Sequence, residues 1–397
     1  MISERETTLQ ALDRARRILA ALETKKAGYT SLDLPASLMI ELEDQQKIVA
    51  DLEGRVLGFG PRPGLVAARP ASGFKAHPAA NPLERHYNEI LDNLVKGKVV
   101  IFLGPGINLG ERGPEEAFAP GQHLPTSPDL ANYLAENFGY SLDDPDDLPK
   151  VSQYIQIARG YGELYDELHN LFNLDYAPNL VHRFFGLLPS VLREKGFSPR
   201  PLLFITSNYD DVLERAFREA GVEYDLVSYI AEGEQRGKFL HWPLGQSQSQ
   251  LIERPNEYSQ LSLEQRSVIL KIHGAVDRYD TERDSYAITE DHHINYLSRA
   301  DIGSLMPYNL VAKLRKSPYL FLGYSLQDWR LRVVLNRLWP EQQLKYKSWA
   351  VELNPQELDK NFWMKWGVEM LDNPLADYLA GLGERLENLP SGSGETV

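Results

Sequence analysis

Short, almost wholly apolar segments recur along this chain, and segments with helical periodicity separate them. This alternation constrains the fold more than any other feature, because strands buried on both faces belong in a parallel sheet covered by helices. The predicted strands are residues 99–103, 202–206, 225–230, 268–273, 319–323 and 348–353. The predicted helices are residues 83–95, 127–138, 148–158, 161–171, 179–188, 210–219, 327–338 and 374–386. The sequence therefore predicts an α/β fold with a doubly wound parallel sheet.

The pattern divides the chain into three parts. Residues 1–57 predict a helical hairpin, because leucines and valines recur there at helical spacing on both sides of Gly28 and Pro35. We expect this pair of helices to serve in oligomerisation or as an adaptor. Residues 58–82 are rich in Gly, Pro and Ala and predict a linker. We expect residues 83–390 to form the ligand-binding domain, with a helical insertion at about residues 140–200 that covers the strand ends.

Composition excludes several classes of protein. The chain has no cysteine, so disulfides, thiolate zinc sites, iron–sulfur clusters and a cysteine nucleophile are excluded. A net charge of −14 disfavours nucleic acid as the main ligand. No apolar run approaches the length of about 18 residues that a membrane-spanning helix needs. The charged N-terminus also lacks the apolar core of a signal peptide, so we expect a cytoplasmic protein without a membrane partner.

Glycine, proline or polar residues end or follow four of the predicted strands. They are Gly104, Pro105, Gly106 and Asn108 after the first strand, Thr206, Asn208 and Asp210 at the second, His273 at the fourth, and Gly323 and Ser325 at the fifth. Each group alone has a structural explanation, such as a tight turn, a helix N-cap or a buried core histidine. Because the carboxyl ends of parallel strands lie at one edge of a sheet, we expect the four groups to form one ligand-binding crevice.

These four groups, in this order, resemble the sirtuin superfamily, and in particular the bacterial sirtuin-like NADases of antiphage defence systems. The likeness covers about residues 99–353. It implies that the residues of the first loop, Gly104, Pro105, Gly106 and Asn108, hold phosphate, with Pro105 and Asn108 standing where the family commonly has Ala and Ser. It also implies that Thr206, Asn208 and Asp210 form the Thr-x-Asn-x-Asp motif at the nicotinamide ribose, that His273 is catalytic, and that Gly323 and Ser325 bind the adenosine ribose.

The resemblance implies a reaction as well as a fold, which would be a sirtuin-like variant of the Rossmann fold. Protein-deacylating sirtuins use four cysteines to bind zinc beside the acyl-lysine cleft, and this chain has none. Water is therefore the expected acceptor, and the expected activity is hydrolysis of NAD to nicotinamide and ADP-ribose without a metal. His273 would act as general base, for which the ordinary imidazole pKa of about 6.5 is suitable. Asn208 would bind the ribose hydroxyls or position water, and Asp210 would orient a neighbour or stabilise charge.

Partners are expected on the same grounds. Hydrolysis of NAD is toxic to a cell, so such an enzyme should be held inactive until it is triggered. We expect a homo-oligomer and a regulatory protein of the defence system, for example an ATPase. The hairpin, including Gly28, Tyr29, Thr30 and Pro35, also resembles the short helical adaptor found before bacterial conflict-system effectors.

Three alternatives remain open at this point. A binding module that senses NAD or an ADP-ribose derivative without turnover would fit Pro105 and Asn108. A dehydrogenase is disfavoured because Gly110 lies one position late for the Gly-x-Gly-x-x-Gly motif. A metal enzyme would use Asp291, His292 and His293, but adjacent histidines point in different directions, so we predict a solvated loop there.

Overall fold

The computed structural model describes residues 82–391, except residues 113–115, 142, 247, 299–304, 325–328 and 339–343. The predicted hairpin at residues 1–57 and the predicted linker, up to residue 81, lie outside the described residues. Ser325 lies outside them as well. Among the helices that are described, none is long and apolar enough to span a bilayer.

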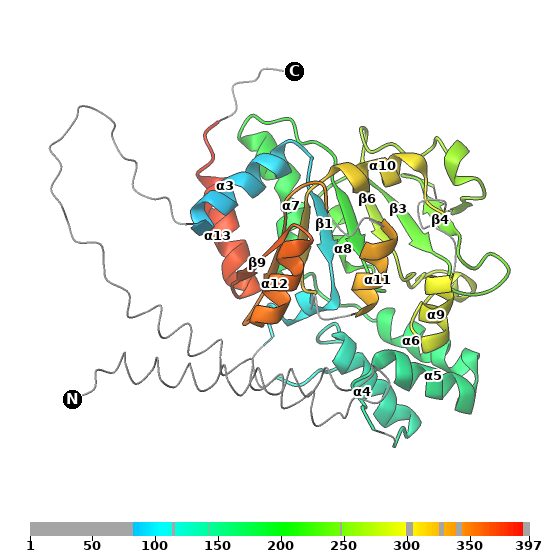
Figure 1. Ribbon diagram of the computed structural model, residues 1–397. Helices are drawn as coiled ribbons and strands as arrows, with labels where there is room; N and C mark the ends of the chain where they lie inside the picture. The colour runs from blue at the N-terminus through cyan, green and yellow to red at the C-terminus, as the bar shows by residue number, and fades with distance from the viewer. Residues whose placement is uncertain are drawn as a thin grey trace, which may run out of the picture. The chain divides into compact units, whose positions relative to one another are not determined.

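A nine-stranded sheet, counted over the described residues, forms the centre of the domain (Figure 1). The strand order is β5-β4-β3-β6-β2-β1-β7-β8-β9, and only the pairs β3–β4 and β4–β5 are antiparallel. The strands are β1 (Val100–Leu103), β2 (Leu203–Thr206), β3 (Tyr224–Tyr229), β4 (Phe239–Trp242), β5 (Gln250–Leu251), β6 (Ser267–Lys271), β7 (Tyr319–Leu322), β8 (Ser348–Glu352) and β9 (Val368–Asp372). The predicted α/β class with a doubly wound parallel sheet is confirmed.

Helices cover both faces of the sheet, because the side chains of each strand alternate between two apolar cores. In β1, Val100 and Phe102 belong to one core, and Ile101 and Leu103 belong to the other. The first core is completed by α9 (Glu290–Ser298), α10 (Tyr308–Lys316), α11 (Trp329–Leu338) and α12 (Glu357–Lys365). The second is completed by α3 (Pro82–Val95), α7 (Leu180–Glu194), α8 (Val212–Glu219) and α13 (Leu375–Glu387).

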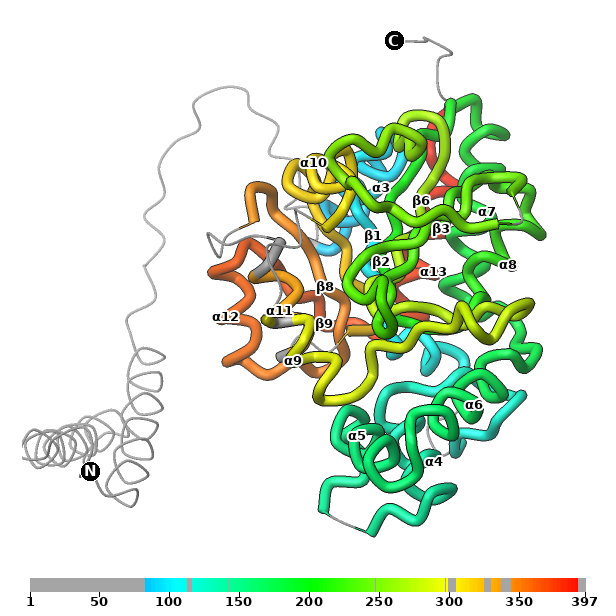
Figure 2. Tube along the Cα trace, turned by 90° about the vertical axis from the view of Figure 1, so that its right-hand side faces the viewer, coloured from blue at the N-terminus to red at the C-terminus, as the bar shows by residue number. Residues whose placement is uncertain are grey.

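A third apolar core belongs to a helical lobe beyond the strand ends (Figure 2). The lobe consists of α4 (Ser127–Phe138), α5 (Leu148–Arg159) and α6 (Tyr161–Phe172). It begins before residue 140, where we predicted the insertion to start. It also ends before α7, because Phe185 and Leu188 of α7 pack on the sheet. A capping box between Thr126 and Asp129 defines the start of α4.

Polar contacts attach the lobe to the sheet domain on two sides. On the β1 side, Arg112 pairs with Asp129 through nitrogen and oxygen atoms 2.7 Å apart, and Asn108 donates to the Pro125 carbonyl. On the β6 side, His169 Nδ1 lies 2.7 Å from Asp284 Oδ2. These contacts hold the lobe over the carboxyl ends of the central strands.

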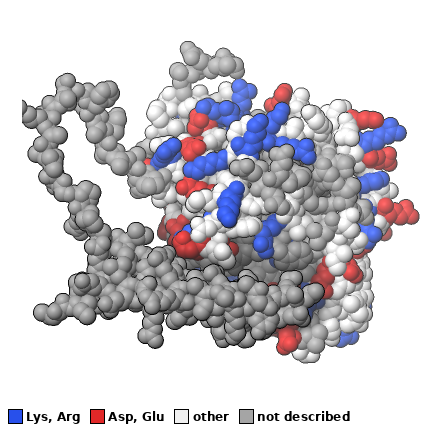
Figure 3. Space-filling model, viewed as in Figure 1, with Lys and Arg blue, Asp and Glu red and all other residues white. Residues whose placement is uncertain are grey.

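Charged side chains of both signs share the described surface. In Figure 3, Lys and Arg are interspersed with Asp and Glu over the face in view. The expectation that nucleic acid is not the main ligand stays a prediction.

Candidate active site

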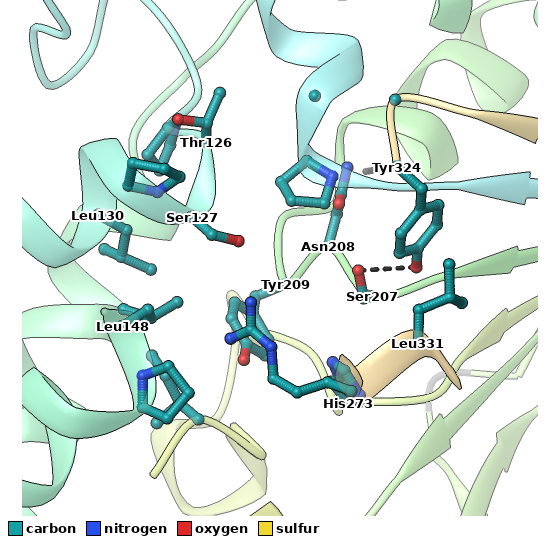
Figure 4. Close-up of a pocket in the computed structure, with 18 of the residues that line it drawn as sticks. Thr126, Ser127, Leu130, Leu148, Ser207, Asn208, Tyr209, His273, Tyr324 and Leu331 are labelled. Atoms are coloured by element: carbon teal, nitrogen blue, oxygen red, sulfur yellow. Dashed lines mark hydrogen bonds between the residues drawn. The ribbon is translucent and has the colours of Figure 1, made fainter. Parts of the chain in front are cut away.

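A cavity of about 810 Å³ lies between the carboxyl edge of the sheet and the lobe. This volume is in the usual range of small-molecule sites, roughly 300–1,000 Å³. Figure 4 shows Ser127, Leu130 and Leu148 of the lobe on one side, with Asn208 and His273 on the other. The cavity therefore brings the strand-end residues together, as the doubly wound topology predicts.

Asn208 places in the cavity a buried amide oxygen that has no hydrogen-bond partner within the part of the chain that the structure describes. Its backbone N–H donates to the Thr206 hydroxyl over 3.0 Å, which fixes the turn after β2. Its side chain lines the cavity, and the residue is only 8% exposed. The amide oxygen Oδ1 is buried, and no donor among the described residues reaches it. A buried acceptor of this kind normally has a partner, so it fits a ligand that brings a hydroxyl donor.

Asp210 and Lys271 support the loop that carries Asn208. Asp210 Oδ1 accepts the Val212 N–H over 3.0 Å, so this carboxylate caps the turn that leads into α8. Lys271, at the end of β6, donates to the Asp210 carbonyl, and its Nζ lies 2.8 Å from Glu214 Oε1. Burial raises the pKa of Glu214, although Lys271 opposes that effect. Asp210 also lines the cavity, so its structural role as a cap does not remove it from the site.

His273 follows β6 and lies beside a second imidazole. The ring of His293 meets it edge to face, with ring centroids 5.5 Å apart, and both residues line the cavity. Burial holds the pKa of His293 well below its ordinary value, and His273 and Arg330 lower it further. His293 is therefore neutral at physiological pH. The turn after His273 requires Gly274, because φ is +90° there and a Cβ would overlap the Ser285 carbonyl.

The loop after β1 forms a short 3-10 helix, Pro105–Leu109. The Gly104 N–H donates to the Leu322 carbonyl, and the Gly106 N–H donates to the Gly323 carbonyl. The Ile107 N–H donates to the Gly104 carbonyl, and Pro105 has no N–H. These backbone groups are therefore already paired, so the structure differs here from a loop whose amides are open to a phosphate.

Packing between two loops explains the glycines at the ends of β1 and β7. A Cβ at Gly104 or Gly106 would overlap the Gly323 carbonyl, and a Cβ at Gly323 would overlap the Ile107 nitrogen. Next to Gly323, the Tyr324 hydroxyl donates to Ser207 Oγ over 2.8 Å, as the dashed line in Figure 4 shows. This bond links the loop after β7 to the loop after β2.

Most of the predicted site residues line the cavity, and two others support the loops that form it. Those that line it are Pro105, Gly106, Asn108, Asn208, Asp210, His273 and Gly323. Gly104 packs against the β7 loop and Thr206 orients the Asn208 backbone, but neither lines the cavity.

From the sequence we did not assign Tyr324 or Arg330 to the site, and we considered His293 only as a rejected metal ligand. We predicted helices over the strand ends but not which of their side chains line the cavity. Arg330 lay within a predicted helix that directly follows a predicted site loop, and that position was the available signal.

The prediction of a solvated loop at Asp291, His292 and His293 is wrong. These residues lie on α9, and both histidines are buried. His292 Nδ1 accepts the backbone N–H groups of Ile288 and Thr289, so its Nε2 carries the proton and donates to Glu232 over 2.6 Å. His292 and His293 thus face different surroundings. Within the described residues, no group of three His, Asp or Glu side chains is placed to hold a metal ion.

The fold and the cavity define a class of protein: a doubly wound α/β domain with a cavity of small-molecule size at the carboxyl edge of its sheet. Residues 202–371 match the family model of the SIR2-like domain. The match includes Asn208, His273 and Gly323, and it begins after the Gly104–Asn108 loop. It supports a sirtuin-like, NAD-dependent enzyme family with a Rossmann-type fold. No curated protein matches the chain.

Proposed function

We propose that the chain is an NAD hydrolase that cleaves the bond between nicotinamide and ribose. The observation that carries the proposal is the buried, unpaired amide oxygen of Asn208 in the cavity that His273 also lines. A ribose supplies the hydroxyl donors that this oxygen lacks. SIR2-like domains use NAD, so the family match supports NAD as the source of that ribose.

The proposed reaction needs an oriented ribose and a base for water. The bond from ribose C1 to the nicotinamide nitrogen breaks, and its electron pair leaves with nicotinamide, which becomes neutral. The oxygen of water bonds to C1, and one water proton passes to a ring nitrogen of His273. Asn208 holds the ribose hydroxyls while positive charge develops on the sugar ring. Asp210 acts by holding the Asn208 loop in place, and the products are nicotinamide and ADP-ribose.

Incubation of the purified full chain with NAD tests the activity. We expect nicotinamide and ADP-ribose in equal amounts, identified by chromatography and mass. Unchanged NAD after prolonged incubation, together with binding of ADP-ribose, would instead support a sensor without turnover.

We also propose that the enzyme acts in antiphage defence from the cytoplasm, as an assembly held inactive by a regulatory protein such as an ATPase. The predicted adaptor hairpin at residues 1–57 supports the assembly, because paired amphipathic helices commonly join chains. We expect the mass in solution to correspond to an oligomer for the full chain and to a smaller species without residues 1–80. Equal monomeric masses for the two would contradict the assembly.

A further inference from the structure

Arg330, in the first turn of α11, places a positive charge in the cavity. Among the described residues that line the cavity, it is the one lysine or arginine. Its charge adds to the effect of burial in lowering the pKa of His293, and it opposes the rise that burial causes in the pKa of Tyr209; both residues also line the cavity. Arg330 therefore shares the cavity with His293 and Tyr209 and is near enough to both for its charge to act on them.

The glycine loop offers little to balance the charge of a phosphate. The N–H groups of Gly104, Gly106 and Ile107 are bonded to carbonyls, and Pro105 has none. Asn108 is engaged as well, since its side-chain amide donates to the Pro125 carbonyl over 2.9 Å. A phosphate at this loop needs its countercharge from another part of the cavity.

The lobe side of the cavity cannot supply that charge. Its lining includes Asp144, Asp146 and Asp147, which lie between α4 and α5, whereas the other two carboxylates among the described lining residues, Asp210 and Glu290, come from the loop after β2 and from α9. The three lobe aspartates repel an anionic group, so the side of the cavity on which Arg330 lies is the more favourable one for it. A diphosphate in this cavity therefore belongs near α11.

We propose that Arg330 binds the pyrophosphate of the dinucleotide substrate. This assignment rests on the proposed function of the cavity. A guanidinium can donate two parallel N–H groups to two phosphate oxygens, and such charged pairs are about twice as strong as neutral hydrogen bonds. Lysine keeps the charge but loses the paired geometry, so Arg330→Lys should retain part of the binding and Arg330→Met should retain little.

The test compares ligands with and without phosphate. In Arg330→Met, we expect the KM for NAD and the Kd for ADP-ribose, measured by calorimetry, to rise roughly 10- to 100-fold. The kcat for NAD should change only a few-fold, and the Kd for adenosine should not change. Arg330→Lys should fall between the wild type and Arg330→Met. The matched control is Arg332→Met on the same helix, because Arg332 lies over the Phe362 ring outside the cavity lining, and it should leave every constant unchanged.

Two results would overturn the assignment. One is a wild-type Kd for ADP-ribose in Arg330→Met, and the other is an equal loss of adenosine binding, which would indicate a packing role. Failure of the proposed function is a separate result. If the wild type leaves NAD intact but binds ADP-ribose in an Arg330-dependent way, the hydrolase proposal fails and the Arg330 assignment stands. If the wild type does not bind ADP-ribose, the assignment fails.

Discussion

Close packing of two backbone segments requires glycine at three positions near the site. The motif suggests a different reason, namely the approach of a phosphate. Gly323 adopts φ of +69°, and a Cβ there would overlap the backbone of Ile107. A Cβ at Gly104 or at Gly106 would likewise overlap the Gly323 carbonyl. These residues allow the β1 and β7 loops to touch, and that contact sets the shape of the cavity floor.

Substitution of Gly323 tests this requirement at a single residue. Gly323→Ala should lower the free energy of unfolding by clearly more than Gly139→Ala. Gly139 has nearly the same φ, +66°, but a Cβ there meets nothing within 4 Å. Gly139→Ala should therefore lower the free energy of unfolding only by the backbone strain, about 1–2 kcal/mol. Urea denaturation measures both changes, and equal losses would show that the loops tolerate a side chain.

At the scale of the element, the buried pair Lys271–Glu214 joins the end of β6 to α8. Lys271→Met should lower the free energy of unfolding by about 3–5 kcal/mol, because it leaves the Glu214 carboxylate buried without a cation. The double variant Lys271→Met, Glu214→Leu should recover much of that loss.

The matched control for this pair is Lys96→Met. Lys96 pairs with Asp92 one helical turn away, and both side chains are more than half exposed. We expect a change below about 1 kcal/mol there. Urea denaturation compares all of these variants, and a double variant no more stable than Lys271→Met would contradict the account of the buried pair.

Buried histidines in two helices should make stability depend on pH. Burial lowers the pKa of His86 in α3 and of His182 in α7 from 6.5 to about 4 each. Between those values the unfolded chain binds the proton and the folded chain does not. The free energy of unfolding should therefore fall as the pH drops from 6.5 towards 4, by up to about 1.4 kcal/mol per pH unit for each histidine.

Denaturation at pH 7 and at pH 5 measures this dependence in the wild type and in His182→Gln. Gln can keep the capping interaction that His182 makes with the Asn179 N–H. The variant should lose less stability than the wild type over this interval. Equal losses would mean that His182 is protonated in the folded state.

Prediction of elements from the sequence succeeded where burial is complete. β1, β2 and β7 are wholly buried, so their sequences are continuous apolar runs apart from Thr206 at the end of β2. β4 and β9 were not predicted, because β4 alternates buried and half-exposed positions and β9 carries Glu369 and Asp372 at exposed or half-exposed sites. α9 was missed because it buries histidines, and their partner Glu232 is distant in the sequence.

At the scale of the whole molecule, the sheet edge and a helical cover over it could be predicted, but the side chains of the cover that line the cavity could not. Parallel topology brings Asn208 and His273 to one edge, and their positions after apolar strands are visible in the sequence. The lobe residues that close the cavity, such as Leu130 and Leu148, also follow helical periodicity, but which surface they face depends on tertiary packing. The same holds for Arg330 and His293, which reach the cavity from helices on the covering layer.

The central claim is that Asn208 and His273 act together on the ribose of NAD, and turnover by their alanine variants tests it most directly. We expect Asn208→Ala and His273→Ala each to reduce NAD hydrolysis about 100- to 10,000-fold without a change in thermal unfolding. Asn132→Ala and His123→Ala, which remove the same groups outside the cavity lining, should hydrolyse NAD at the wild-type rate. Wild-type rates of hydrolysis in Asn208→Ala or in His273→Ala would contradict the account.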